Sequence, residues 1–158
     1  MVREAALMLG LLASGAAYAG TPLWGKVEAD MPLADVKAAY PEGKVAGSGV
    51  RFKEKVEGCT RNVVISMDRE VSDPAAKVKE VFLIGSSCGP RIFEQLVAKY
   101  GEPRDLSYGD PLGFYGKNDF NKTARWASEG RSIVYKLQGD IISTVWTLTY
   151  APVKDLGL

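Results

Sequence analysis

A short segment of this chain recurs in similar form 60 residues later, and this repetition constrains the fold more than any other feature of the sequence. Residues 38–44 recur as residues 98–104, and each copy ends a stretch whose apolar residues have helical spacing. These residues are Leu33, Val36 and Tyr40 in the first copy and Phe93, Leu96 and Tyr100 in the second. After each helix the apolar spacing changes from helical to alternating, which is typical of strands. The sequence therefore predicts a duplicated unit of one helix followed by antiparallel strands.

Apolar residues that alternate with polar ones predict where the strands of each unit lie. Strands are expected at 50–56, 62–67 and 78–85 in the first unit and at 122–128, 132–138 and 142–150 in the second. In the second unit the apolar residues share one face: Trp126, Ile133, Tyr135, Leu137, Ile142, Trp146, Leu148 and Tyr150. A sheet with one apolar face is covered on that face only. We predict one α+β domain over residues 20–158, with two repeats at about 20–87 and 88–158 and helices packed on one face of an antiparallel sheet.

The first 19 residues have the layout of a removable signal peptide. Arg3 precedes an apolar run at 5–12, and residues 17–19 are the Ala-Tyr-Ala expected before a cleavage site. The run is shorter than the roughly 20 residues of a membrane-spanning helix. The pattern predicts a periplasmic or secreted protein with no transmembrane segment in the mature chain.

Cys59 and Cys88 are the only cysteines, and in an exported chain they are expected to form a disulfide. A redox-active pair is the alternative, but reactive dithiols usually lie close together in the sequence. A hairpin centred on Asp73 and Pro74 would place these cysteines opposite each other. The same register would pair residues on the apolar face: Val63 with Ile84, and Ile65 with Phe82.

Charge and composition exclude several classes of function. The net charge is +1 and the cations are interleaved with carboxylates, so nucleic acid is not an expected partner. The chain has no histidine, which excludes Ser-His and Cys-His nucleophile systems and His-based metal sites. The glycine-containing segment 85–89 lacks the lysine of a phosphate-binding loop. A carboxylate-based hydrolase stays open, although Glu57, Asp68 and Glu70 have the setting of exposed strand or turn residues. We therefore predict no catalytic residue, cofactor or metal.

Two surfaces are candidates for binding a partner. The segment 105–121 is long and lacks periodicity, yet it carries Tyr108, Phe114, Tyr115 and Phe120. Aromatic residues on such a loop can bind a partner, and the alternative is a connection whose aromatics pack back onto the sheet. The second surface is the polar face of the sheet, represented by Arg125 and Lys136.

Two further groups of residues have alternative interpretations. Trp126, Tyr135 and Trp146 resemble an aromatic binding platform, but they share a face with aliphatic residues, which favours a place in the core. Cations at 51, 53 and 55 either contact an acidic partner or an anionic surface, or keep an edge strand from aggregating.

The ends of the two helices carry a family resemblance, in the segments Tyr40-Pro41-Glu42 and Tyr100-Gly101-Glu102-Pro103. With the helix-then-strands order, they resemble exported modules of the β-lactamase-inhibitor-protein-like group, whose relatives include small outer-membrane assembly lipoproteins with one such unit. Members commonly have two helices per unit and the lipoproteins have a lipidated cysteine, and this chain departs from both patterns. The resemblance implies a sheet-based surface that binds proteins, and no specific partner.

We therefore expect an exported, non-enzymatic module that binds a protein or an envelope component, in the manner of an inhibitor. Two alternatives remain. One is a carrier that encloses a small apolar ligand, and the other is a carboxylate-based glycan hydrolase.

Overall fold

The computed structural model describes residues 20–109, 120–139 and 143–153. The predicted signal peptide at 1–19 and the candidate residues Phe114 and Tyr115 lie outside the described residues. No helix within the described ranges has the length and apolar character needed to cross a membrane.

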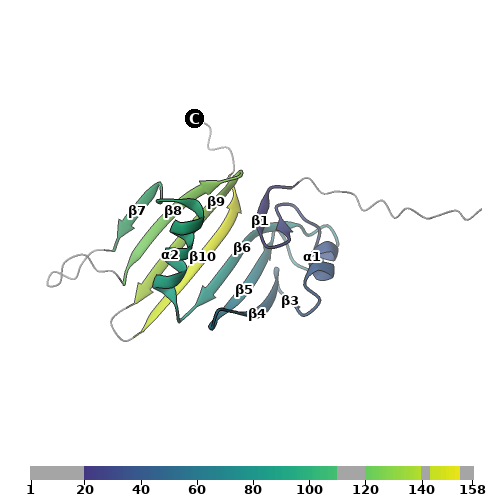
Figure 1. Ribbon diagram of the computed structural model, residues 1–158. Coiled ribbons are helices and arrows are strands. Elements are labelled where there is room, and N and C mark those ends of the chain that lie inside the picture. The colour runs from purple at the N-terminus through teal and green to yellow at the C-terminus, as the bar shows by residue number, and fades with distance from the viewer. Residues whose placement is uncertain (1–19, 110–119, 140–142, 154–158) are drawn as a thin grey trace, which may run out of the picture.

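The main body is one eight-stranded antiparallel sheet, seen from one side in Figure 1. Its strand order is β3-β4-β5-β6-β10-β9-β8-β7. In chain order, the first four strands of this sheet are β3 (Lys44–Ala46), β4 (Gly49–Val56), β5 (Cys59–Met67) and β6 (Val78–Gly85). The others are β7 (Asp105–Tyr108), β8 (Lys122–Ser128), β9 (Arg131–Gly139) and β10 (Thr144–Pro152). Strands β6 and β10 pair at the middle, so the sheet is continuous from end to end.

Four smaller elements accompany the sheet. They are the hairpin of β1 (Pro22–Trp24) and β2 (Val27–Glu28), and the helices α1 (Leu33–Ala39) and α2 (Gly89–Tyr100). Helix α1 has 7 residues and buries only Val36, whereas α2 has 12 residues and buries Gly89, Ile92 and Leu96.

The predicted fold class, an α+β domain built from a duplicated unit of helix and antiparallel strands, is wrong. Of the residues that the structure describes, 53% lie in strands and 16% in helices, and the body is the single eight-stranded sheet. The prediction failed because the two helices differ in length and in the number of residues that they bury. A helix of two turns cannot cover half of such a sheet, and the β1–β2 hairpin shares that role with α1.

Helix α2 lies across β8, β9 and β10 (Figure 1). Phe93 packs on the rings of Trp126 and Tyr135, with centroid separations of 6.0 and 5.6 Å. The Tyr135 hydroxyl donates a 2.7 Å hydrogen bond to the carbonyl of Gly89 at the start of the helix. Burial raises the pKa of Tyr135, so the phenol stays neutral and remains a donor. These contacts place the second helix and the aromatic residues of β8 and β9 in one core, as the sequence predicts.

The β1–β2 hairpin and α1 cover the other half of the same face. Leu23, Val27 and Val36 are buried in the core with Val50 of β4. Tyr40 at the end of α1 stacks on Phe52 at 5.0 Å. One face of the sheet is therefore covered along most of its width.

The β5–β6 hairpin shows a register error in the sequence-based prediction. Val63 pairs with Leu83, and Ile65 pairs with Val81. The expected partners, Ile84 and Phe82, are each displaced by one residue, and a shift of one residue moves a side chain to the opposite face. The hairpin has an irregularity between Ser66 and Met67, and both faces of β6 carry apolar residues. The periodicity alone therefore did not select the register.

Gly85 gives a direct test of the core between β6 and β10. A Cβ at this position would lie 2.6 Å from ring atoms of Trp146, which is fully buried. We expect Gly85→Ala to lower the free energy of unfolding by about 1–3 kcal/mol, because the packed ring cannot move away without strain. Urea unfolding followed by circular dichroism measures this, with the exposed Ser86→Ala as the matched control. Equal stability of the two variants would contradict the described contact.

Candidate functional site

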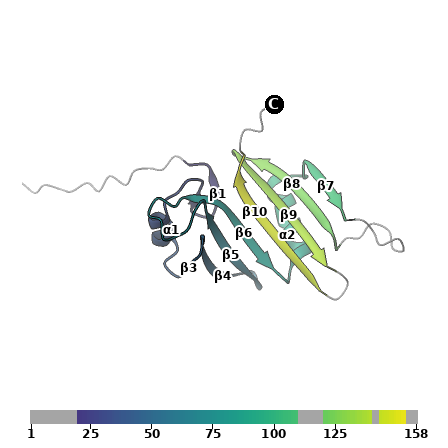
Figure 2. The same ribbon diagram turned by 180° about the vertical axis from the view of Figure 1, so that it is seen from behind.

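The second face of the sheet is the candidate functional site. Figure 2 looks onto it, with α2 behind the strands. The hairpin and both helices contact the first face, so the described residues leave the second face uncovered.

Strand register arranges this face into cross-strand rows. The first row crosses all eight strands: Lys44, Arg51, Val64, Phe82, Thr149, Val134, Arg125 and Asp105. The second row runs beside it: Lys53, Asn62, Ile84, Thr147, Lys136, Thr123 and Ser107. We call these two rows, with the flanking Lys55 and Glu80 on the same side of their strands, the open face.

The middle of the open face is apolar. Val64, Phe82, Ile84 and Val134 are half-buried, although no described element lies over them. Directly paired residues on one side of a sheet shield each other, which explains why these side chains are only partly exposed. The threonines at 147 and 149 sit between them on β10. A row of apolar side chains at the centre of an uncovered face is a surface suited to contact with another molecule.

Cations flank the apolar middle. Arg51 lies on one side of it, and Arg125 and Lys136 lie on the other. The two carboxylates of the open face are in ion pairs, Asp105 with Arg125 at 3.3 Å and Glu80 with Lys79 at 3.7 Å.

Protection of an edge strand from aggregation explains only some of the cations at 51, 53 and 55. Strand β3 pairs only with Gly49–Arg51 of β4, so Lys53 and Lys55 lie where β4 has no described neighbour on its outer side. At Arg51, β4 is paired with a strand on each side, and the same holds for β9 at Lys136. Protection of an edge strand does not account for these two.

The structure separates the residues predicted to bind a partner. Arg125 and Lys136 are exposed and lie diagonally adjacent on the open face. Tyr108 belongs to the opposite face, where Lys122 lies over its ring with 5.8 Å between Nζ and the ring centroid. Phe120 is 37% exposed and precedes β8. Tyr108 is therefore not part of one site with Arg125 and Lys136.

Sequence reasoning missed Phe82 and Ile84 as surface residues because the one-residue register error assigned them to the core. The signal that could have located them is the run of four apolar residues at 81–84, which indicates a strand with apolar residues on both faces.

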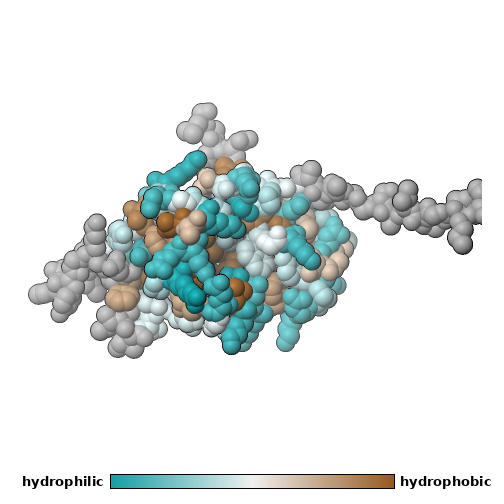
Figure 3. All heavy atoms as spheres, viewed as in Figure 1, coloured by the Kyte–Doolittle hydropathy of each residue, from teal (hydrophilic) through white to brown (hydrophobic). Residues whose placement is uncertain are grey.

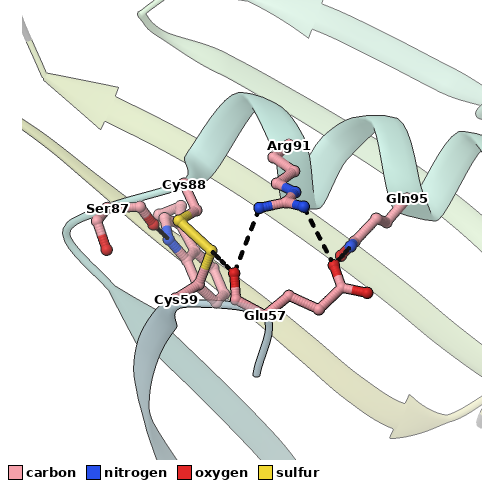
Figure 4. Close-up of a disulfide and its surroundings, with 7 residues drawn as sticks. Glu57, Cys59, Ser87, Cys88, Arg91 and Gln95 are labelled. Carbon is pink, nitrogen blue, oxygen red and sulfur yellow. Dashed lines mark hydrogen bonds and ion pairs between the residues drawn. A yellow bond between two sulfur atoms is a disulfide. The ribbon is translucent and has the colours of Figure 1, made fainter. Parts of the chain in front are cut away.

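The disulfide predicted between Cys59 and Cys88 is confirmed, and it belongs to a group of contacts at the tip of the β4–β5 hairpin. Figure 4 shows Glu57 at this tip pointing toward α2. Its carboxylate accepts a 2.9 Å hydrogen bond from Gln95 and pairs with Arg91 at 3.5 Å. Glu57 therefore fastens the hairpin to the helix.

The carboxylate alternative finds no support at Asp68. The pKa of its carboxyl is lowered, chiefly because it accepts a 2.9 Å hydrogen bond from the backbone N–H of Lys77. A general acid of a glycosidase needs a raised pKa. No group of three or more His, Cys, Asp or Glu that could hold a metal ion is found in the described part of the chain.

The space between α2 and the sheet is filled by side chains rather than shaped for a ligand. Ile92 and Leu96 of α2 belong to the same buried cluster as Trp126, Tyr135 and Leu137. On this side of the molecule, hydrophobic residues show at the surface as separate patches among hydrophilic ones (Figure 3). The packed layer gives the carrier alternative no structural support.

Comparison of the chain with protein-family models, with curated proteins and with solved structures found no match. The resemblance to β-lactamase-inhibitor-like modules thus stays a prediction.

Proposed function

We propose that this protein is an exported, non-enzymatic binding module, periplasmic or secreted, whose open face binds a protein or an envelope component. The observation that carries the proposal is the apolar centre of an uncovered sheet face, flanked by cations. An apolar centre with a polar rim is the usual anatomy of a protein interface. The disulfide fits a location outside the cytoplasm.

The size of the open face supports the proposal. Seven strand spacings of about 4.8 Å give a width of about 35 Å, and the rows with their neighbours extend about 20 Å along the strands. The resulting area is about 700 Å², close to the roughly 800 Å² that each partner contributes to an interface of standard size.

Substitution at the centre of the open face tests the proposal. Phe82→Glu places a charge in the apolar middle, and Thr149→Trp fills the adjacent position with a bulky side chain. We expect both variants to capture their partner from envelope extract at least tenfold less efficiently than the wild type, because central residues dominate interface energy. Mass spectrometry of the captured material measures this.

Phe120→Glu is the matched control, since it changes an aromatic residue of the 105–121 segment outside the open face. It should capture the same partner as the wild type. If only Phe120→Glu lost the partner while all variants kept their thermal stability, the loop would be the binding surface and the open face would be rejected.

A further inference from the structure

The charges of the described residues are distributed unevenly over the two sides of the sheet. These residues include 17 Lys and Arg and 14 Asp and Glu, a net charge of +3. The open face carries six of the cations and two of the carboxylates, a net charge of +4. All other described residues together carry a net charge of −1. The whole positive excess of the described chain therefore lies on the open face.

Most of this charge is not neutralised by ion pairs among the described residues. Within residues 20–109, 120–139 and 143–153, five cations of the open face form no ion pair: Lys44, Arg51, Lys53, Lys55 and Lys136. Arg51 and Lys136 are separated by four strand spacings, about 19 Å. Between them lie the apolar side chains at 64, 82 and 84. Unpaired cations on one face attract a negatively charged partner and orient its approach.

A second copy of the chain is a poor occupant, because two open faces would bring like charges together. A lipid surface is also a poor occupant. Membrane-binding surfaces insert apolar side chains about 5–10 Å into the headgroup boundary. On the open face the apolar side chains are half-buried, and the strands that carry them have a neighbouring strand on each side. These side chains form a flat apolar surface, which suits contact with another protein.

Building on the proposed function, we infer that the open face binds an acidic protein surface. Carboxylates of the partner meet the two groups of cations, and an apolar patch between those carboxylates covers the side chains at 64, 82, 84 and 134. The cations set the association rate and the salt dependence, and the apolar centre supplies most of the contact.

Site-specific photocrosslinking tests this inference. The mature chain carries p-benzoylphenylalanine in place of Phe82, and in a second version in place of Val134, and is irradiated in its own envelope. The expected adduct is a protein whose crosslinked peptide lies within an acidic surface. The affinity of that purified protein for the wild type is then measured at low and at physiological salt.

Charge reversal tests the role of the cations in the same binding assay. Arg51→Glu with Lys136→Glu changes two cations that edge protection does not explain. We expect about a tenfold loss of affinity and a weaker salt dependence. The matched control is Lys26→Glu with Lys37→Glu, which makes the same change in net charge at exposed positions on the hairpin turn and α1. It should bind as the wild type does.

The outcomes separate the inference from the function on which it rests. A protein adduct with a neutral or basic contact surface, or equal affinity for both double variants, would overturn the acidic partner and leave a protein-binding face. An adduct with lipid, with binding to vesicles of phosphatidylglycerol and phosphatidylethanolamine, or an adduct with a second copy of the chain, would also overturn it. Absence of any adduct from both positions would reject the open face itself.

Discussion

Trp146→Ala is expected to lower the free energy of unfolding by about 3–5 kcal/mol. Trp146 is fully buried on β10, one of the two central strands, and its ring packs against the backbone of Gly85 on the other, β6. Its indole N–H donates a 2.6 Å hydrogen bond to the carbonyl of Ser87. The substitution removes the ring, leaves a cavity and deprives this carbonyl of its donor. Since small domains have about 5–15 kcal/mol of stability in total, the loss is large.

Urea unfolding followed by far-ultraviolet circular dichroism measures this effect without relying on tryptophan fluorescence. Val145→Ala is the matched control, because Val145 is the neighbouring residue of β10 and is 45% exposed. It should stay within about 0.5 kcal/mol of the wild type. A loss below about 1 kcal/mol for Trp146→Ala would show that the ring is not part of a packed core.

Removing the disulfide is expected to cost about 3–4 kcal/mol, chiefly by enlarging the conformational freedom of the unfolded chain. Cys59 and Cys88 are 29 residues apart in the sequence. The variant is Cys59→Ala with Cys88→Ala, because alanine places no new polar group at position 59, which is 4% exposed. Chemical unfolding with and without reductant measures the effect.

Reductant provides the internal control for this measurement. The wild type should lose most of the same free energy when dithiothreitol is added, and the alanine variant should not respond. A wild type that unfolds identically with and without reductant would argue that the disulfide is not formed in the purified protein.

The sequence predicted the bounds of individual strands and the core aromatic residues well. The strands expected at 78–85 and 122–128 coincide with β6 and β8. Trp126, Tyr135 and Trp146 are core residues rather than a surface platform, as their aliphatic neighbours indicated. The disulfide was predictable because the chain has only two cysteines.

The pairing of β5 with β6 was not predictable in the same way. Residues 81–84 are all apolar, so either register places apolar side chains on the covered face. The disulfide did not decide between them, because both registers bring the cysteines close together. The error concealed Phe82 and Ile84, which form the centre of the open face.

The fold class was not predictable from the repeated segment because similar short sequences do not ensure similar helices. The first helix has a single buried residue, and Pro32 precedes it without a side-chain cap. The second buries three residues and has Pro90 in its first turn. The balance of strand and helix depends on these tertiary contacts, which the local pattern does not contain.

The contacts at the tip of the β4–β5 hairpin have a consequence for recognition. Through Cys59 and Glu57 this tip is joined to α2, and α2 packs on β8, β9 and β10. The hairpin carries one group of cations of the open face, and β8 and β9 carry the other. The covalent link therefore restrains twisting between the two halves of the sheet. The distance between the positive groups is preorganised in the free protein, so little conformational entropy is lost when a partner with matching charge spacing binds.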